Sequence, residues 1–507
     1  MDKIFHRKHK KFIHKIEACD GREYPLKKMV IFIFLIVTST SLFAQTQVNG
    51  VQSGTWTVAN SPYLVIGEII VPTGQTLTIE AGIEINFQGH YKFTVHGNLQ
   101  AIGTETDSIF FTTSTPAIGW GGVRFDGYGE ISNLSFCRIE YGKTAGEYPD
   151  NHGGAIALIG SDAVFSNCVF ADNEAVANDS GMGGAVYASG TGSTAGPLTI
   201  FSECRFIRNH AYGEGGAIKF TGDYNTEIIT CEFFNNNCLY GGGAISFYLV
   251  TDTKLIYSVF ADNYTMYSNG GAFNTLGMGN TITAQNCTIS GNSAVTGDGG
   301  AINIAYGTAN FVNCIVYDNP GMYSDDVNLD YGGYAEINYC DLTMPNGATG
   351  SNNIDENPQF VDAANLDFHL METSPCIDAG DPSSPPDPDG TVADMGAFYY
   401  HQGMGIENGE FQTENFQLFN YPNPFYSYTV INFSLPANNS KNPKLEIYNL
   451  TSQKVKTLVG DQPDAGQYSV IWNGKDDSNK PVPSGVYFYK LKAGSFKKIG
   501  KMILVKE

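Results

Sequence analysis

Residues 153–173, GGAIALIGSDAVFSNCVFADN, decide the fold of this chain. The stretch joins a Gly-Gly-Ala turn to a segment spaced apolar-x-x-Cys-x-apolar-x-x-Asn. Gly-Gly-Ala occurs six times, starting at residues 153, 183, 215, 242, 270 and 299, so its intervals are 27 to 32 residues. A repeat of this length indicates a solenoid, in which each unit buries its apolar face against its neighbours.

Two kinds of solenoid fit the apolar spacing. A leucine-rich repeat also ends its motif with Asn, but it requires a helix or a tight helical turn on its convex side. Here the intervening residues are mostly Gly, Asn, Asp, Ser and Thr with a second short apolar run, and no helical periodicity is present. The sequence therefore predicts an all-β fold, a parallel β-helix with several short strands in each coil.

The repeated Asn and Gly positions have structural roles in such a fold. Coils stack at about 4.8 Å, so we expect one Asn side chain per coil to hydrogen bond along the axis and close a turn. The paired Gly residues allow close backbone approach where a Cβ would clash. The predicted Asn ladder contains Asn173, Asn209, Asn236, Asn263, Asn292 and Asn319.

Seven cysteines fall at one position of the repeat, and Ser258 takes the same position in another coil. An exported chain rich in Cys usually forms disulfides. In parallel coils, however, matched side chains point the same way and cannot bridge. We therefore expect buried thiols that pack as small apolar groups, at Cys137, Cys168, Cys204, Cys231, Cys287, Cys314 and Cys340.

The repeats define the domain boundaries. Residues 45–402 are predicted to form the β-helix, with opening coils at 45–130, repeats at 131–345 and a closing segment rich in Asp and Pro at 346–402; a linker follows at 403–415. In the closing segment, Asp387, Asp389 and Asp394 offer hard oxygen ligands in a turn, so calcium is the one candidate metal. A solvated acidic turn is the alternative, and we expect no other cofactor.

Residues 1–44 are predicted to be a signal peptide with a long basic n-region. The apolar run at 30–37 is too short to span a bilayer, and small residues lead to a cleavage site after Ala44. The alternatives are a buried strand for this run and a true start at Met29. Later apolar runs stay below 18 residues, so we expect no transmembrane helix in the mature chain.

Charge excludes some partners. Between residues 45 and 415 the chain has 41 acidic and eight basic side chains, a surface that repels nucleic acid. The scarcity of cations also disfavours a lyase acting on acidic polysaccharides. An inverting hydrolase needs carboxylates about 6.5 to 9.5 Å apart, and Asp325-Asp326 is the only Asp-Asp pair in this region. The sequence identifies no catalytic residue.

The repeats resemble known families. The GGAI stretch at 153–156 and the FADN stretch at 170–173 resemble the repeats of polymorphic outer-membrane proteins and of bacterial right-handed β-helix proteins. Residues 374–380, 387–390 and 394–397 are similar to the segment that ends many surface β-helix chains before an anchor. This resemblance implies a right-handed β-helix exposed at a cell surface.

Residues 416–507 read as about seven alternating strands with Pro and Gly turns, which predicts an immunoglobulin-like sandwich. The motifs YPNPF at 421–425, IWNG at 471–474 and SGVYFYKL at 484–491 resemble the type IX secretion C-terminal sorting domain. The resemblance implies recognition by that secretion machinery, passage across the outer membrane, and then surface attachment or release. An ordinary appended binding domain is the alternative.

These features together predict a secreted, surface-anchored adhesin or carbohydrate-binding protein, located at the cell surface or in the medium. Four tyrosines beside the Gly-Gly turns offer platforms for sugar rings, namely Tyr212, Tyr240, Tyr264 and Tyr267. The alternative is that these rings simply cover the backbone. A polysaccharide lyase or glycoside hydrolase is the alternative, and a purely structural surface spacer is the third hypothesis.

Overall fold

The structure is a computed structural model. It describes residues 45–126, 131–190, 198–222, 224–322, 326–387, 391–400, 402, 418–421, 429–435, 443–449, 453–459, 466–477, 480–483, 485–493 and 496–504. The predicted signal peptide at 1–44 and the predicted linker at 403–415 lie outside the described residues.

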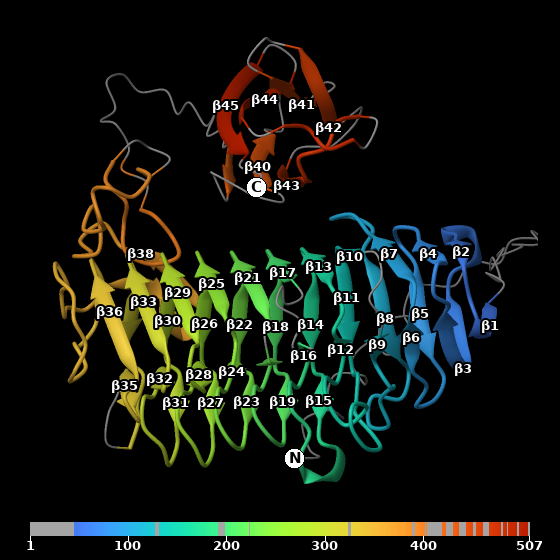
Figure 1. Ribbon diagram of the computed structural model, residues 1–507, viewed down its shortest axis with the longest axis horizontal. Coiled ribbons are helices and arrows are strands. Elements are labelled where there is room, and N and C mark those ends of the chain that lie inside the picture. Colours follow the sequence, from blue (N-terminus) through green and yellow to red (C-terminus); the bar gives the residue numbers. More distant parts are fainter. Residues whose placement is uncertain are drawn as a thin grey trace, which may run out of the picture.

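Residues 46–338 form a parallel β-solenoid, whose strands lie side by side along the long axis of the molecule (Figure 1). Its first stack contains β1 (Thr46–Val51), β3 (Tyr63–Val71), β5 (Glu84–Phe87), β8 (Ile109–Thr113), β11 (Cys137–Glu140), β14 (Val169–Ala171), β18 (Arg205–Ile207), β22 (Glu232–Phe234), β26 (Val259–Ala261), β30 (Thr288–Ser290) and β34 (Ile315–Tyr317). The second stack starts from the end of β3 and contains β6 (Phe93–Val95), β9 (Val123–Asp126), β12 (Ile156–Ile159), β16 (Val186–Ser189), β20 (Ile218–Thr221), β24 (Ile245–Tyr248), β28 (Phe273–Leu276), β32 (Ile302–Ala305) and β35 (Val327–Asp330).

A third sheet faces these two. It contains β2 (Gly54–Trp56), β4 (Thr76–Ile79), β7 (Asn98–Ile102), β10 (Ser132–Ser135), β13 (Ala163–Ser166), β17 (Leu198–Ser202), β21 (Asn225–Ile229), β25 (Asp252–Ile256), β29 (Thr281–Gln285), β33 (Thr308–Val312) and β36 (Tyr334–Asn338). Short strands complete the middle coils, namely β15 (Glu174–Ala175), β19 (His210–Ala211), β23 (Asn237–Cys238), β27 (Tyr264–Thr265) and β31 (Ser293–Ala294). Two 3-10 turns, η1 (Val58–Asn60) and η2 (Ala177–Asp179), lie in connections. The parallel β-solenoid expected from the repeats is confirmed.

Two residues with a left-handed backbone conformation bend the chain in each middle coil. In one coil they are Asn167, just before the repeated Cys, and Asp172, just before the repeated Asn. The next coil places Glu203 and Arg208 at the same positions. Left-handed φ values are unusual for such residues, so the bends depend on the bonds made by the flanking Cys and Asn.

The interior Asn side chains form a continuous hydrogen-bonded column. Asn209 Nδ2 donates to Asn236 Oδ1 at 2.9 Å and to the carbonyl oxygen of Phe170 at 3.0 Å. Asn236 Oδ1 also accepts the backbone N–H of Asn209 at 3.0 Å. Matching Nδ2–Oδ1 bonds of 2.8 to 2.9 Å join all six members, Asn173, Asn209, Asn236, Asn263, Asn292 and Asn319.

The repeated cysteines lie inside the solenoid as free thiols, and Cys238 and Cys376 are free thiols in two smaller buried clusters. Cys168 Sγ donates to the carbonyl oxygens of Ser166 and Leu134 at 3.4 Å. Ser258 fits the column because its hydroxyl accepts the backbone N–H of Cys231 at 3.1 Å. Burial raises the pKa of the Cys137 and Cys340 thiols well above the usual range, so these two groups stay protonated and unreactive.

Aromatic rings complete the core. Phe206 stacks on Phe170 at 4.7 Å and on Phe233 at 4.6 Å, with interplanar angles of 4° and 2°. Phe165 stacks in the same way on Phe201. Identical residues therefore pack on identical residues along the axis, which gives each coil the same apolar partner above and below.

The closing segment continues the parallel stack for a short distance and then turns back as a hairpin. Residues 349 and 354 form isolated parallel bridges to Glu336 and Asp341, so the stack does continue briefly past β36. The chain then forms an antiparallel hairpin, β37 (Phe360–Asp362), η3 (Ala363–Asn365) and β38 (Asp367–Leu370), which folds back along the solenoid. Phe368 packs against Phe234 and Val259, several coils earlier. The hairpin thus covers an apolar flank and does not close the end of the stack.

The C-terminal module is a separate antiparallel β-structure with its own core around Ile447, Trp472 and Leu491. One sheet contains β39 (Leu418–Tyr421), β40 (Thr429–Leu435) and β43 (Gly466–Trp472), and the other contains β42 (Lys454–Val459), β41 (Lys444–Asn449), β44 (Gly485–Ala493) and β45 (Phe496–Leu504). The predicted immunoglobulin-like sandwich is confirmed. Within the described residues, no helix has the length and apolarity that a membrane crossing needs.

Candidate functional site

The outer face of the second stack carries a column of side chains that changes from coil to coil. We call it the outer seam. Strand alternation directs these side chains away from the core, and parallel register places each beside the next. Its members are Arg124, Ala157, Tyr187, Lys219, Ser246, Asn274, Asn303 and Asn328.

The seam is nearly closed to solvent although it faces outward. Arg124, Tyr187 and Lys219 expose 4 to 5% of their surface. The covering residues come from the connections that lead into each Gly-Gly pair. At Gly241, for example, an added Cβ would lie 2.8 Å from Asn274 Nδ2. The seam is therefore a polar crease between the strands and these connections.

Toward the last coils the seam consists of amides that satisfy one another. Asn303 Nδ2 donates to Asn274 Oδ1 and Asn328 Nδ2 donates to Asn303 Oδ1, both at 2.8 Å. This part of the seam is a second Asn ladder, on the outside of the solenoid, and it stabilises the stacking of the coils.

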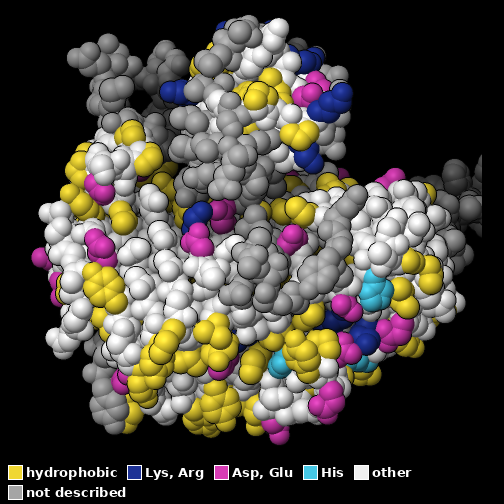
Figure 2. Space-filling model, viewed as in Figure 1, with side chains coloured by type: hydrophobic (Ala, Val, Ile, Leu, Met, Phe, Trp, Pro, Cys, Tyr) yellow, Lys and Arg dark blue, Asp and Glu magenta, His cyan; other side chains and the backbone are white. Residues whose placement is uncertain are grey.

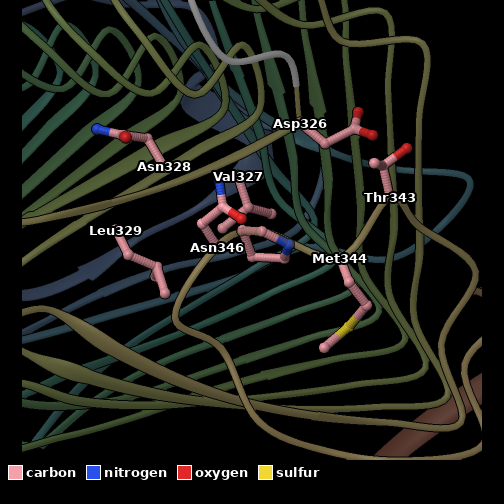
Figure 3. Close-up of a pocket in the computed structure, with 8 residues that line it drawn as sticks. Asp326, Val327, Asn328, Leu329, Thr343, Met344 and Asn346 are labelled. Carbon is pink, nitrogen blue, oxygen red and sulfur yellow. The ribbon is translucent and has the colours of Figure 1, made fainter.

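A hollow of about 300 Å³ lies where this part of the seam ends. Residues 326–329 and 343–346 line it (Figure 3). Figure 3 shows the polar ends of Asp326 and Thr343 on one side and Asn328 apart from them. Asp326 Oδ1 accepts the last donor of the interior ladder, Asn319 Nδ2, at 2.9 Å. The polar groups here are therefore already used by the fold.

In the middle of the seam, Lys219 is paired inside a small network. Lys219 Nζ lies 2.5 Å from Glu214 Oε2 and donates to Ser246 Oγ at 3.0 Å. Ser246 Oγ in turn donates to Glu214 Oε2 at 2.8 Å. The ammonium group also lies 5.5 Å from the centre of the Tyr248 ring, so this charge is well compensated.

Arg124 begins the seam and is less well compensated. Its Nη1 donates to the carbonyl oxygen of Gly153 at 2.6 Å. Its Nε lies 3.8 Å from Asp150 Oδ1, and among the described residues neither Nε nor Nη2 has a hydrogen-bond partner. Asp150 is held by Lys92, whose Nζ lies 2.8 Å from Oδ2. Burial lowers the pKa of Arg124 to about 10, although Asp150 acts in the opposite direction.

Three rings lie next to this arginine. The His152 and Tyr187 rings are 4.5 Å apart, and the exposed Tyr148 ring meets His152 edge-on at 5.7 Å. His152 Nδ1 accepts the backbone N–H of Met182 at 3.1 Å, which leaves the ring proton on Nε2. Burial, with Arg124 and Lys219 nearby, lowers the pKa of His152 to about 4. The imidazole is therefore neutral at physiological pH.

Charged and histidine side chains gather on this face over β6, β9 and β12 (Figure 2). A hollow of about 200 Å³ opens among them, lined by Glu68, His90, Lys92, Gly121, Ala145, Gly146 and Asp150. Four of the eight basic residues between 45 and 415 lie along this wall, namely Lys92, Arg124, Lys143 and Lys219. The sparse cations of the solenoid are thus concentrated.

Exposed tyrosines flank the later part of the seam on both sides. Tyr240 and Tyr267, in the covering connections, have ring centres 6.0 Å apart. Tyr306 and Tyr331, just beyond β32 and β35, stack at 5.1 Å with an interplanar angle of 12°. Figure 2 shows hydrophobic side chains gathered over β23, β27 and β31. Exposed apolar surface of this extent is typical of an interaction site.

The predicted calcium ligands are only partly described. Asp387 Oδ2 accepts the backbone N–H of Asp394 at 2.8 Å, and the Asp394 carboxylate accepts the N–H groups of Asp378 and Tyr400. Asp389 lies outside the described residues. Among those that are described, no three His, Cys, Asp or Glu side chains converge as a metal site. Calcium binding stays a prediction.

The sequence analysis did not single out Arg124 or His152. One signal was present: residues 120–124, WGGVR, align with residues 153–157, GGAIA, in the strand register. Comparing the last position across coils gives Arg, Ala, Tyr, Lys, Ser, Asn and Asn. The neighbouring positions of the repeat keep similar residues while this position varies, which indicates that its side chain is not fixed by the stacking of the coils.

Comparison with known proteins identifies the C-terminal module. Residues 427–496 match the family model of the FlgD Ig-like domain. No curated protein matches the chain. Among solved structures, 18% of this chain aligns with dimeric latent PorU from Porphyromonas gingivalis at 19% identity, with a TM-score of 0.15. The match spans 9% of that chain, and at this TM-score it carries no weight for fold or function.

Proposed function

We propose that this protein is a secreted, cell-surface-anchored adhesin that binds extracellular polysaccharide along the tyrosine-flanked face of its solenoid. The two pairs of exposed tyrosines, Tyr240 with Tyr267 and Tyr306 with Tyr331, are the observation that carries the proposal. Tyrosine offers an apolar ring and a polar hydroxyl at low entropic cost, which suits a ligand with apolar faces and hydroxyl edges. A solenoid repeats this surface along its axis, as an extended polymer requires.

Binding is tested by incubating the purified protein with immobilised neutral and acidic polysaccharides, with and without Ca²⁺. We expect retention on at least one polymer and a loss of at least tenfold in affinity for the double variant Tyr306→Ala/Tyr331→Ala. Phe110→Ala, which removes an exposed ring from the first stack, is the matched control. Retention that does not change with the tyrosines would contradict the assignment, and no retention on any polymer would favour a structural spacer.

Export through a type IX pathway is the second part of the proposal. Its support is the sequence resemblance of residues 416–507 to sorting domains and the immunoglobulin-like fold of this module. We expect a chain without residues 416–507 to accumulate in the periplasm in folded form. Normal surface display of this truncated chain would contradict the sorting role while leaving polysaccharide binding untouched.

A polysaccharide lyase or hydrolase is the second candidate, and the cluster of Arg124, His152 and Tyr187 favours it. A neutral imidazole beside a buried guanidinium is an arrangement able to accept a proton near a stabilised anion. The same incubations are therefore scored for new reducing ends and for new unsaturated ends. Turnover that is lost in His152→Gln would replace the adhesin proposal with an enzymatic one.

A further inference from the structure

We propose that Arg124 binds the carboxylate of an acidic sugar residue through the edge of its guanidinium formed by Nε and Nη2. The inference rests on the proposed polysaccharide binding and names the class of polymer, one that contains uronic acids. It assigns the first coils of the outer seam to recognition and the tyrosine-flanked coils to general contact with the chain.

The first support is the hydrogen-bond state of Arg124. Arg124 is 5% exposed, and within the part of the chain that the structure describes only its Nη1 has a hydrogen-bond acceptor. Buried polar groups in proteins are nearly always hydrogen bonded, and a buried charged donor without a partner is costly. An arginine kept in this state indicates that its acceptors come from outside the chain.

The second support is which atoms lack acceptors. In a guanidinium, the Nε–H bond and one Nη2–H bond are parallel and point from the same edge. This edge matches the two oxygens of a carboxylate in a bidentate pair. Nη1, on the opposite side, is fixed by Gly153 O. The free edge is therefore oriented by the protein.

The third support is the local charge. Lys92 and Arg124 both face Asp150, but Lys92 Nζ is close at 2.8 Å while Arg124 Nε is 3.8 Å away. Glu68, which lines the same hollow, accepts the backbone N–H of Lys92. Asp150 thus lies near the free edge without bonding to it, and we infer that a ligand carboxylate displaces it.

The route to this edge is the hollow of about 200 Å³ beside Asp150. The Asp150 side chain is one-third exposed at its mouth, so it can turn outward. Gly121 forms the opposite wall, and a Cβ there would lie 2.7 Å from Lys92 Cγ. Tyr148 and His152, on either side of Asp150 in the chain, place rings close to where a bound sugar would lie.

The experiment measures the affinity of the full chain for a uronic acid oligomer and for its methyl ester, which has the same backbone without the charge. We expect the acid to bind at least tenfold more tightly than the ester. Arg124→Gln removes this preference, and Asp150→Asn increases affinity for the acid about threefold or more. Arg208→Gln, which breaks an exposed pair with Asp172, is the control and changes neither affinity.

Several outcomes would overturn the inference. Equal binding of acid and ester, or an acid preference that persists in Arg124→Gln, removes the role of Arg124. Arg124→Lys keeps the charge but loses the two-pronged edge, so full acid preference in that variant also contradicts it. Arg124-dependent binding of a sulfated polymer but not of the acid would exclude a carboxylate. These results leave the tyrosine-dependent binding intact, whereas no binding of any polymer overturns the proposed function itself.

Discussion

The interior Asn ladder and the outer seam are built by the same stacking geometry, yet they behave differently. Inside, the same residue recurs in six coils and each amide is bonded above and below. Outside, the column passes from Arg124 through Tyr187 and Lys219 to three Asn residues. Repetition is required where every coil must close in the same way. Where the closing of the coil does not require a particular residue, the position can vary and its side chain can contact a ligand.

The largest loss of stability is expected from a substitution at the Gly-Gly turn. An added Cβ at Gly216 would lie 2.0 Å from the carbonyl oxygen of Gly243 in the next coil. Gly216→Ala should force the coils apart and destabilise the solenoid by at least about 3 kcal/mol, because backbone cannot move aside. Gly89→Ala is the control, since its Cβ would meet the Tyr91 side chain and no backbone atom. Urea denaturation compares the two, and equal midpoints would contradict close coil contact.

The two Asn columns provide the next test. Asn236→Ala leaves the backbone N–H of Asn209 without an acceptor in the core and removes one of the two acceptors of its side-chain amide. We expect a loss of about 3 to 4 kcal/mol. Asn303→Ala, in the outer seam, should cost about 1 to 2 kcal/mol, because its donor Asn328 is partly exposed and can bond to water instead. If both changes cost the same in urea denaturation, the distinction between interior and seam fails.

His152 gives the seam a pH dependence that the interior lacks. Its pKa falls from 6.5 to about 4 on folding, so the unfolded chain binds a proton in this range while the folded chain does not. The stability that depends on the neutral ring is present above pH 6.5 and is lost as the pH falls toward 4. We expect a loss of about 2 kcal/mol for this partly buried group. In His152→Gln, the midpoint of thermal unfolding should depend less on pH between 6.5 and 4. If the midpoint changes with pH as steeply as in the unchanged protein, His152 is not the cause.

The smallest effects are expected in the Cys column. Cys231→Ser should cost about 1 kcal/mol or less, because Ser258 already shows that a hydroxyl makes the same bonds. The reverse change, Ser258→Cys, completes the column and should leave stability nearly unchanged. Thiol titration after denaturation should find all nine cysteines that follow residue 45. Seven or fewer reactive groups would indicate disulfides.

The interior of the solenoid was predictable because its signals are local and repeated. The spacing of Cys, Phe and Asn in residues 165–173 specifies strand, bend, strand and ladder, and the pattern recurs in each middle coil. The left-handed bends at Asn167 and Asp172 were not predicted, since the residue type at these positions varies among coils. The return of residues 360–370 along the flank was also missed, because its partner Phe234 lies more than 100 residues away.

The sequence by itself determined the repeat, and with it the parallel stack, the buried thiols and the Asn column, because a period of one coil brings like residues together wherever the chain begins to wind. It also separated the C-terminal sandwich by composition. Only the tertiary structure brought Lys92, Arg124 and Asp150 together. They come from three successive turns and share no motif, so their contact depends on the path of the connections between strands. The candidate site therefore depends on how the coils wind, and the repeat determines that winding.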